Sequence, residues 1–355
     1  MRSISLVVPG SLDQRTGGYI YDRRMAEGLR SCRWHVDVVE LPGDFPPPAP
    51  AALEHASRAF ERMPAGAIVV IDSRAFGALP DLIERESPRL RIVALIHLPL
   101  VTAARLEGRP TAVVMEAERR ALQCAAQIIV TGKAALPLLA EYAPPFDRVV
   151  VVEPGTHRAP LARGSRHPSE ATAPLELLCV ANLNATKGHE MLLEALAAVA
   201  HDGWRLTCAG SLTRDPGTVA QVRATITRLG VEHRVSLVGE LRDDELESCF
   251  DRADVVVLAA RQETYGMAVA EALARGIPVV STGTGAIAEL VNHEAGLVVP
   301  VDDRAALVSA LARVIHDDDL RMRLSEGARR VRSRLRTWEE AAERMSAVLD
   351  PLTHG

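Results

Sequence analysis

The chain has 355 residues, of which 48% are hydrophobic and 25% are charged, and its net charge is -5. That length is enough for two domains and exceeds one ordinary core, and the composition is that of a globular protein. Basic residues are spread along the chain instead of forming a patch, so no nucleic-acid partner is expected.

The first residues, MRSISLVVPG, are typical of a short strand and not of a signal peptide, and no stretch has the roughly 18 consecutive apolar residues of a membrane span. We therefore expect a cytoplasmic protein. The five cysteines are scattered at no metal-like spacing, and the histidines show no ligand spacing either. The sequence thus predicts no metal site, and it predicts reduced, buried cysteines that serve as small apolar residues. The cysteines are Cys32, Cys124, Cys179, Cys208 and Cys249.

Short runs rich in valine and isoleucine alternate with amphipathic stretches in the first part of the chain. Runs that are apolar on both faces are typical of a parallel sheet covered by helices. The stretches between them include Tyr21, Met25 and Leu29, at the spacing of one helix face. Residues 1–158 are therefore predicted to form a Rossmann-like domain. The expected strands are 4–9, 36–41, 67–72, 92–97, 128–132 and 149–153.

Residues 159–174 interrupt this pattern. They are dense in proline, glycine, serine and alanine without an apolar period, which is the composition of an exposed linker. A second doubly wound domain is predicted over 175–337, and two such domains would leave a cleft between them. The last helical stretch is interrupted near Thr337, and its final part, about 338–355, is a candidate to pack back on the first domain. The expected strands are 175–181, 206–210, 235–238, 255–259, 279–282 and 297–301.

Residues 261–280, RQETYGMAVAEALARGIPVV, carry two glutamates on either side of a glycine turn. Glu263 is expected in the loop after a buried strand and Glu271 in the helix that follows, at the edge where open α/β sheets bind ligands. The first amides of that helix, near 265–268, would be free to receive an anion. The alternative is a capping acid and a helix-surface acid in an ordinary crossover.

Lys187 lies in the segment ANLNATKGH, directly after a predicted strand and before a predicted helix. The only other lysine in the chain is Lys133. An ammonium group beside a helix N-terminus is suited to a phosphate. The alternative is a surface lysine in a loop, and the presence of Glu263 in the same domain makes the phosphate site the favoured interpretation.

Gly17 and Gly18 follow the first predicted strand, and paired glycines let a backbone approach a ligand closely. They do not form a GxGxxG fingerprint, and a plain turn is the alternative. His97 ends the predicted strand 92–97 and so lies at a ligand-binding edge, although a histidine in that place can also be structural. Gly283 and Gly285 form a further glycine turn that fits either an anion or a tight loop.

These motifs, distributed over nearly the whole chain, together resemble the family 4 glycosyltransferases of the GT-B fold. The resemblance implies an α/β fold of two Rossmann-like, doubly wound parallel-sheet domains that face each other across a cleft, with 1–158 on the acceptor side and 175–337 as the nucleotide-sugar donor domain. Enzymes of the family transfer a sugar from a nucleoside diphosphate with retention of configuration and need no bound metal. The motifs are ETYGMAVAEALARGIPVV with Glu263 and Glu271, Lys187 after VANLNAT, Gly17 and Gly18, His97, and GAIAELV.

The resemblance also implies a role for each matching residue. Glu263 would touch the hydroxyls of the donor sugar, Lys187 would neutralise the leaving diphosphate, and His97 would border the reacting sugar. The remaining positions would bind other parts of the donor, namely its ribose, base and phosphates, and some of them would do so through backbone amides. These donor-binding positions are Gly17, Gly18, Asn182, Leu241, Tyr265, Gly266, Met267, Ala268 and Glu271.

One position departs from the family pattern. Five residues before the lysine the family usually has an arginine, and this chain has Asn182. An amide donates hydrogen bonds but cannot offset the charge of a diphosphate as a guanidinium does. Arg15 and Arg261 are the candidates to supply the missing charge.

The implied function is a metal-independent, retaining glycosyltransferase of the hexosyltransferase type, acting on a small soluble or carrier-linked acceptor. No cofactor is expected beyond the donor substrate, a nucleotide sugar with uridine as the favoured base. No separate carboxylate can be placed as a covalent nucleophile, so a same-face substitution is favoured. Acids and bases are balanced over 101–127, so a stable membrane association is not favoured. The alternatives are another GT-B activity, such as a sugar-phosphate synthase or transfer to an unusual nucleophile, and a non-catalytic nucleotide-sugar binding protein.

Overall fold

The structure is a computed structural model that describes residues 2–43, 45–106, 108–165, 174–199 and 203–353. The chain divides into two compact units, of which unit 1 comprises 1–155 together with 336–355 and unit 2 comprises 156–335. Each unit contains one six-stranded sheet, and all pairings in both sheets are parallel. Among the described residues, no helix has the length and apolar character needed to span a membrane.

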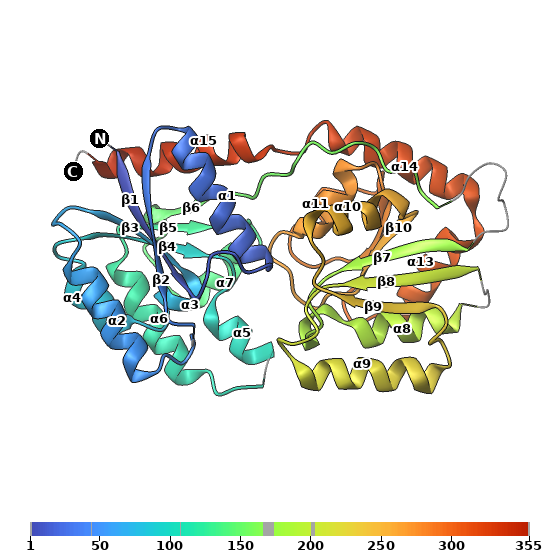
Figure 1. Cartoon of the computed structure of the whole chain (residues 1–355), viewed down its shortest axis with the longest axis horizontal. Coiled ribbons are helices and arrows are strands. Elements are labelled where there is room, and N and C mark those ends of the chain that lie inside the picture. Colours follow the sequence, from blue (N-terminus) through green and yellow to red (C-terminus); the bar gives the residue numbers. More distant parts are fainter. Residues whose placement is uncertain (1, 44, 107, 166–173, 200–202, 354–355) are drawn as a thin grey trace. The chain divides into compact units, whose positions relative to one another are not determined.

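The sheet of unit 1 has the strand order β2-β1-β3-β4-β5-β6. Its central strands are almost entirely apolar and buried, because helices cover both faces of the sheet (Figure 1). The chain order reverses between β1 and β3, and the crevice beyond their carboxyl ends is where open sheets of this kind bind ligands. The strands are β1 (Ser3–Pro9), β2 (His35–Leu41), β3 (Ile68–Asp72), β4 (Arg91–Ile96), β5 (Gln127–Val130) and β6 (Val149–Val151).

The C-terminal helix α15 belongs to unit 1 and lies beside α1 (Figure 1). The two helices approach so closely that a Cβ atom on Gly28 would lie 2.4 Å from that of Ala342. The indole nitrogen of Trp34 also donates a hydrogen bond to Ser346 over 2.8 Å. The helices of unit 1 are α1 (Gly17–Ser31), α2 (Pro50–Glu61), α3 (Ser73–Phe76), α4 (Pro80–Glu86), α5 (Leu100–Leu106), α6 (Ala112–Cys124), α7 (Ala135–Leu139) and α15 (Trp338–Leu349).

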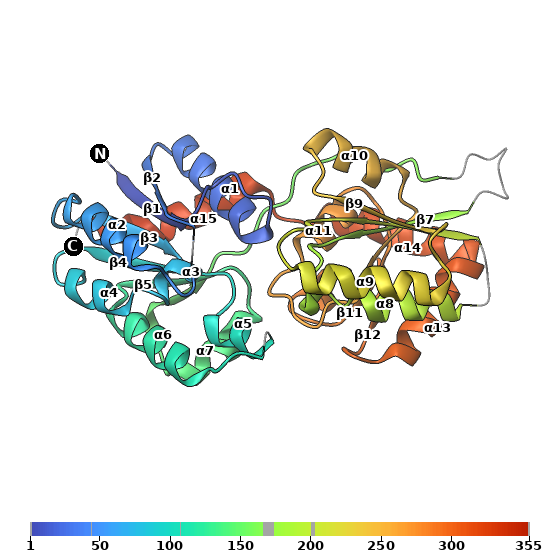
Figure 2. The ribbon, with the colours of Figure 1, turned by 60° about the horizontal axis from the view of Figure 1, so that its bottom comes forward.

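The sheet of unit 2 has the order β12-β11-β10-β7-β8-β9, so its chain order reverses between β7 and β10. Figure 2 shows α8 and α9 side by side next to this sheet. The strands are β7 (Leu175–Val180), β8 (Trp204–Ala209), β9 (Val235–Gly239), β10 (Val255–Leu258), β11 (Val279–Thr282) and β12 (Gly296–Val299). The helices are α8 (His189–Ala198), α9 (Pro216–Leu229), α10 (Asp243–Arg252), α11 (Met267–Ala274), α12 (Ile287–Val291), α13 (Arg304–His316) and α14 (Asp318–Arg332).

Every strand predicted from the sequence is present, with ends that shift by a residue or two. The interruption near Thr337 is also present, because the Thr337 side chain caps α15 in a capping box with Glu340. The boundaries of the two units, at 155/156 and 335/336, lie close to the predicted 158 and 337.

The first part of the predicted exposed linker 159–174 has no helix or strand and is largely exposed, with Leu161 39% exposed, and residues 166–173 lie outside the described residues. Ala159 is buried, and the backbone amide of Ala162 donates to the carbonyl of Arg275 over 2.9 Å. The amides of Arg163 and Gly164 both donate to the carbonyl of Asp251. A composition rich in proline and glycine therefore does not keep this segment from attaching to unit 2 through its backbone.

The prediction that all the cysteines are buried is also wrong in part. Cys179 and Cys208 are fully enclosed in unit 2, whereas Cys32, Cys124 and Cys249 are half-buried. Those three lie on helices or at a helix end, where one side faces the solvent. All five thiols are free.

Candidate functional site

Lys187 and Glu263 meet at the carboxyl ends of two neighbouring strands of unit 2. The Lys187 ammonium donates a hydrogen bond to a carboxylate oxygen of Glu263, and their side chains are 21% and 17% exposed. Lys187 follows β7 and Glu263 follows β10, the two strands between which the chain order of the sheet reverses. The structure thus brings together two residues that the sequence assigned to one site, at the point where such sheets bind ligands.

Gly188 allows the loops after β7 and β10 to touch. Its φ is +65°, and a Cβ atom there would lie 2.0 Å from the carbonyl oxygen of Ala259. The amide of Arg261 donates a hydrogen bond to the carbonyl of Thr186 over 2.7 Å, which connects the same two loops at a second point. Only glycine combines this backbone conformation with this close contact, so Gly188 determines where the ammonium group of the neighbouring Lys187 lies.

A third loop, after β11, supports Glu263 from the other side. The amide of Glu263 donates to the hydroxyl oxygen of Thr284 over 3.1 Å. Gly285 has a φ of +61°, and a Cβ atom there would lie 2.4 Å from the carbonyl oxygen of Glu263. The glycine turn at 283–285 is therefore a tight loop that positions Glu263, which was one of the two interpretations left open by the sequence.

The helix after Glu263 begins without a side-chain cap. Gly266 precedes α11 with a φ of +97°, and the half-exposed Met267 and Ala268 open the helix. Tyr265 is buried against Ala270 and neighbouring apolar side chains, which anchors this turn. Amides at the start of an uncapped helix are donors suited to an anion. Glu271 is half-buried further along the same helix.

Two predicted donor-binding residues lie elsewhere around this sheet. The side-chain oxygen of Asn182 accepts a hydrogen bond from the backbone amide of Ser211 over 2.9 Å, so the Asn182 side chain connects the end of β7 to the loop after β8. Leu241 follows β9, which β8 separates from β7. Arg261, a candidate to replace the family's arginine, pairs with Asp302 at 2.8 Å. The role of each in donor binding stays a prediction.

His97 in unit 1 is held by two buried carboxylates. Its Nε2 lies 2.8 Å from an oxygen of Asp22 in α1 and 3.5 Å from an oxygen of Asp72 at the end of β3. Asp22 is 0% exposed and Asp72 is 4% exposed. The second oxygen of Asp22 has no hydrogen-bond partner among the described residues. The predicted site residue is therefore one member of a cluster of three.

The charges in this cluster shift one another's ionisation. Burial, and after it the charge of Asp22, raise the pKa of Asp72 to about 6 against the opposing effect of His97. For His97, burial acts to lower the pKa, but the charge and hydrogen bond of Asp22 together with Asp72 raise it overall. The histidine thus keeps its proton to a higher pH than a free imidazole does.

Gly18 leaves room for the His97 ring. A Cβ atom on Gly18 would lie 3.2 Å from Cδ2 of His97, and the ring of Tyr21 meets the imidazole edge-on with 5.3 Å between centroids. The structure therefore brings the predicted Gly17-Gly18 turn, which starts α1, to the predicted histidine. The carboxylates of Asp22 and Asp72 were missed, although Asp22 gave a signal as an acid within the apolar stripe formed by Met25 and Leu29.

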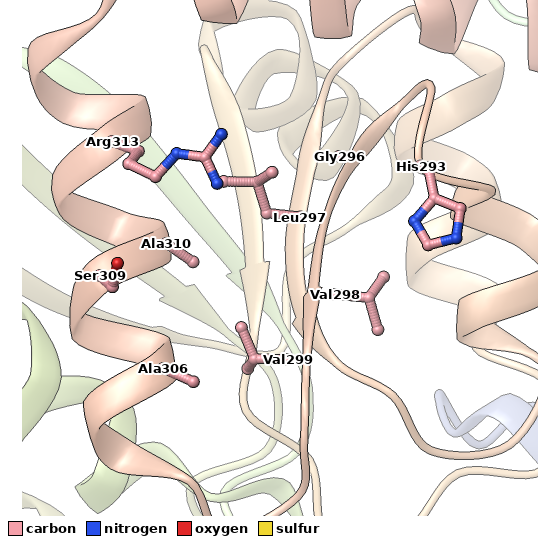
Figure 3. A pocket seen from close by; sticks show the side chains of 9 residues that line it. All are labelled: His293, Gly296, Leu297, Val298, Val299, Ala306, Ser309, Ala310 and Arg313. Atoms are coloured by element: carbon pink, nitrogen blue, oxygen red, sulfur yellow. The ribbon is translucent and has the colours of Figure 1, made fainter.

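A pocket of unit 2 lies apart from these residues, at the edge strand β12. Figure 3 shows side chains of α13, among them Ser309 and Arg313, on one side of β12, and His293 on the other. Leu297 and Val299 supply apolar lining from the strand. None of the residues that line this pocket is a predicted site residue.

Residues 165–331 match the protein family described as glycosyl transferases group 1. This match lies within unit 2, and with a parallel six-stranded sheet in each unit the chain has the GT-B fold.

Two curated relatives show how far this similarity extends. The D-inositol 3-phosphate glycosyltransferase of Xylanimonas cellulosilytica is 30% identical over 238 residues, which make up 62% of this chain and 55% of the relative. The glycogen synthase of Mycobacterium tuberculosis is 31% identical over 195 residues, or 53% of this chain and 45% of that protein. The chain thus spans about half the length of the curated relatives it matches.

Solved structures match over the full length. The sucrose-phosphate synthase of Thermosynechococcus elongatus has a TM-score of 0.83 at 21% identity and covers 99% of both chains. The Anabaena protein HepE in complex with UDP-glucose has a TM-score of 0.77 at 15% identity, with 99% of this chain and 100% of that chain covered. These likenesses confirm the predicted fold.

Proposed function

We propose that the chain transfers a sugar from a nucleoside diphosphate donor to a small soluble or carrier-linked acceptor. The transfer proceeds with retention of configuration, by same-face substitution and without a metal ion in the transfer step. The observation that carries this proposal is the Lys187–Glu263 pair at the switch point of unit 2, beside the uncapped start of α11. A cation, a carboxylate and free backbone amides are the groups that a diphosphate and a sugar require.

In the absence of a donor, Glu263 neutralises Lys187. A diphosphate carries more negative charge than one carboxylate, so it displaces Glu263 from the ammonium group and receives the hydrogen bond itself. The released carboxylate then accepts hydrogen bonds from the sugar hydroxyls, and Glu271 accepts those of the ribose. Binding of the donor thus exchanges one ion pair for another and orients the sugar in the same step.

The chemical step then follows from the leaving group. The bond between the anomeric carbon and the phosphate oxygen breaks, and the acceptor oxygen bonds to the same face of that carbon. The acceptor's proton passes to the departing phosphate oxygen. Lys187 and the first amides of α11 stabilise the charge that develops on the diphosphate, which is the main electrostatic requirement of the step.

UDP is the nucleotide to test first, because HepE of the same fold binds UDP-glucose. Purified protein is screened by thermal shift against UDP, GDP and ADP and their sugars, and donor turnover is followed with a panel of acceptors. A nucleotide at about 100 times its Kd adds roughly 2.7 kcal/mol to the unfolding free energy. If none of these nucleotides binds and none of the sugars is transferred or hydrolysed, the proposal is wrong. Binding without any turnover would indicate a nucleotide-sugar binding protein instead.

Two substitutions separate the roles of the paired residues. Lys187→Ala should lower kcat/KM for the donor about 10²–10³-fold and weaken UDP binding, because it removes the cation on the leaving group. Glu263→Gln should lower kcat as well, but it should leave UDP binding unchanged or tighter, because Lys187 no longer has a carboxylate partner. Lys133→Ala is the matched control, since Lys133 is the other lysine and lies exposed in unit 1. Equal weakening of UDP binding by both site variants would contradict the proposed exchange.

A further inference from the structure

A second group of reactive side chains lies inside unit 2. Cys179 of β7 and Cys208 of β8 are directly opposite each other in the parallel sheet, and His189 is the first residue of α8. The three are 0%, 2% and 2% exposed, in that order. One ligand atom from each lies within 4.8 Å of the other two, and the Sγ of Cys179 is 3.8 Å from Nε2 of His189. None of them belongs to the donor site proposed above.

This group is not an ordinary piece of apolar core. The Nδ1 atom of His189 is buried and has no hydrogen-bond partner among the described residues. The other ring nitrogen, Nε2, is the one that lies beside the Cys179 thiol. The cluster therefore gathers two thiols and an imidazole nitrogen among buried residues of unit 2.

We propose that Cys179, His189 and Cys208 bind a thiophilic metal ion, with zinc as the first candidate. Thiolate and imidazole are the ligands that structural zinc sites use, at about 2.3 Å and about 2.0–2.1 Å from the metal. Two donor atoms at those distances in a tetrahedral site are roughly 3.5–4 Å apart, and the observed separation of 3.8 Å between Cys179 Sγ and His189 Nε2 agrees with this.

The charges also suit a divalent ion. Two thiolates cancel the charge of Zn²⁺ and the imidazole stays neutral, so the ion with these three ligands is uncharged, as their burial requires. A tetrahedral zinc ion would take one further, neutral ligand. Cu⁺ is the other ion that prefers two sulfur ligands and one nitrogen, and three ligands already complete a trigonal site for it. Both ions share the chemistry inferred here, and the experiment below distinguishes them.

The position of the cluster gives the metal a structural role. The ligands come from β7, β8 and the start of α8, and α8 begins immediately after Lys187 and Gly188. A bound ion would fasten the first turn of α8 to the sheet and so hold the loop that carries Lys187. Since all three ligands are buried, we expect the ion to contribute to folding and not to contact a substrate.

Metal content of the untagged full-length protein, purified without chelators, provides the first measurement. Plasma mass spectrometry should find about one equivalent of zinc or copper per chain. Protein stripped of metal under reducing conditions is then titrated with Co²⁺, Zn²⁺ and Cu⁺. Co²⁺ should produce the near-ultraviolet absorption of a thiolate complex, and Zn²⁺ or Cu⁺ should displace it and raise the Tm by several degrees.

Variants show whether the ion is bound at this cluster. Cys179→Ala and Cys208→Ala should each abolish the thiolate band, and His189→Gln should weaken metal binding at least tenfold. Cys249→Ala is the matched control, because this half-buried thiol of unit 2 lies outside the cluster, and it should bind metal like the native chain. The native-chain titration keeps the test meaningful even if a variant does not fold.

Three results would overturn the proposal. The first is stripped native protein that takes up none of the three ions. The second is uptake that Cys179→Ala and Cys208→Ala retain in full. The third is a disulfide between Cys179 and Cys208 in protein purified without reductant, found by mass spectrometry of unreduced peptides. None of these measurements depends on glycosyl transfer, so their outcome does not depend on whether the proposed function is correct.

Discussion

Unit 1 and unit 2 hold polar side chains at the same place in a parallel sheet, but by different means. In unit 1, His97 contacts two buried carboxyl groups, those of Asp22 and Asp72. In unit 2 the Lys187–Glu263 pair is placed by backbone contacts that only glycine permits, at Gly188 and Gly285. The first arrangement depends on ionisation and the second on backbone conformation.

The two units should therefore be sensitive to different changes, one to pH and the other to substitution of glycines. A cluster of buried titratable groups changes its stability and its charge with pH. Loops in contact through glycine do not titrate, but they tolerate no side chain. Unit 1 is therefore expected to respond to pH and unit 2 to substitution of its glycines, and each prediction below tests one side of this comparison.

The largest effect is expected from Gly188→Ala in unit 2. A Cβ atom would lie 2.0 Å from the carbonyl oxygen of Ala259, so either the loop after β7 or that after β10 must move. We expect a loss of about 3 kcal/mol or more in unfolding free energy and a displaced Lys187, with donor turnover reduced at least tenfold. Chemical denaturation and donor kinetics measure the two effects.

Gly230→Ala is the matched control for this substitution. Gly230 has a φ of +68°, close to the +65° of Gly188, but a Cβ atom there has nothing within 4 Å. The control therefore carries the cost of the left-handed conformation alone, about 1 kcal/mol. Equal losses for the two variants would show that the contact with Ala259 is not what restricts position 188.

The sequence revealed the elements of the fold well, because each buried parallel strand is a local pattern of valine and isoleucine. It also singled out Lys187 and Glu263, which meet in the structure, because each lies in the loop that follows a strand. It did not reveal Asp22 and Asp72, or the group of Cys179, His189 and Cys208. Those side chains come from separate elements and meet only in three dimensions. Asp22 alone gave a local signal, as an acid within an apolar helical stripe, and that signal did not indicate its partners. The backbone contacts of 159–165 were missed for the same reason.

The second-largest effect is expected from Glu118 in unit 1, which should make the unfolding free energy depend on pH. This carboxyl group is fully buried on α6, where it accepts hydrogen bonds from the amide of Leu100 and from Tyr142. Burial raises its pKa from 4.5 to about 7. The folded chain thus keeps a proton that the unfolded chain loses, so the unfolding free energy falls as the pH rises from about 4.5 to about 7. Asp72, with its pKa raised to about 6, acts in the same direction.

Glu118→Gln removes this proton and should flatten the pH profile. We expect the loss of stability between about pH 5.5 and about pH 8 to shrink by on the order of 2 kcal/mol, as denaturant titrations at several pH values would show. Glu116→Gln on the same helix is the control, because Glu116 is exposed and its pKa is lowered by the hydrogen bond from Arg119. A native profile that is already flat, or one that Glu118→Gln leaves unchanged, would contradict the assignment.

The smallest effect on stability is expected from Asp22→Asn, which tests the cluster around His97. The substitution weakens a hydrogen bond to the imidazole, but it also removes the repulsion between two buried carboxylates, so the unfolding free energy should change by less than about 1 kcal/mol. The pKa of His97 should nevertheless fall, because Asp22 is the main group that raises it against burial. Histidine signals in NMR spectra recorded over a pH series measure this fall, with Asp13→Asn, an exposed acid ahead of α1, as control. An unchanged pKa would mean that Asp22 positions the ring without setting its charge.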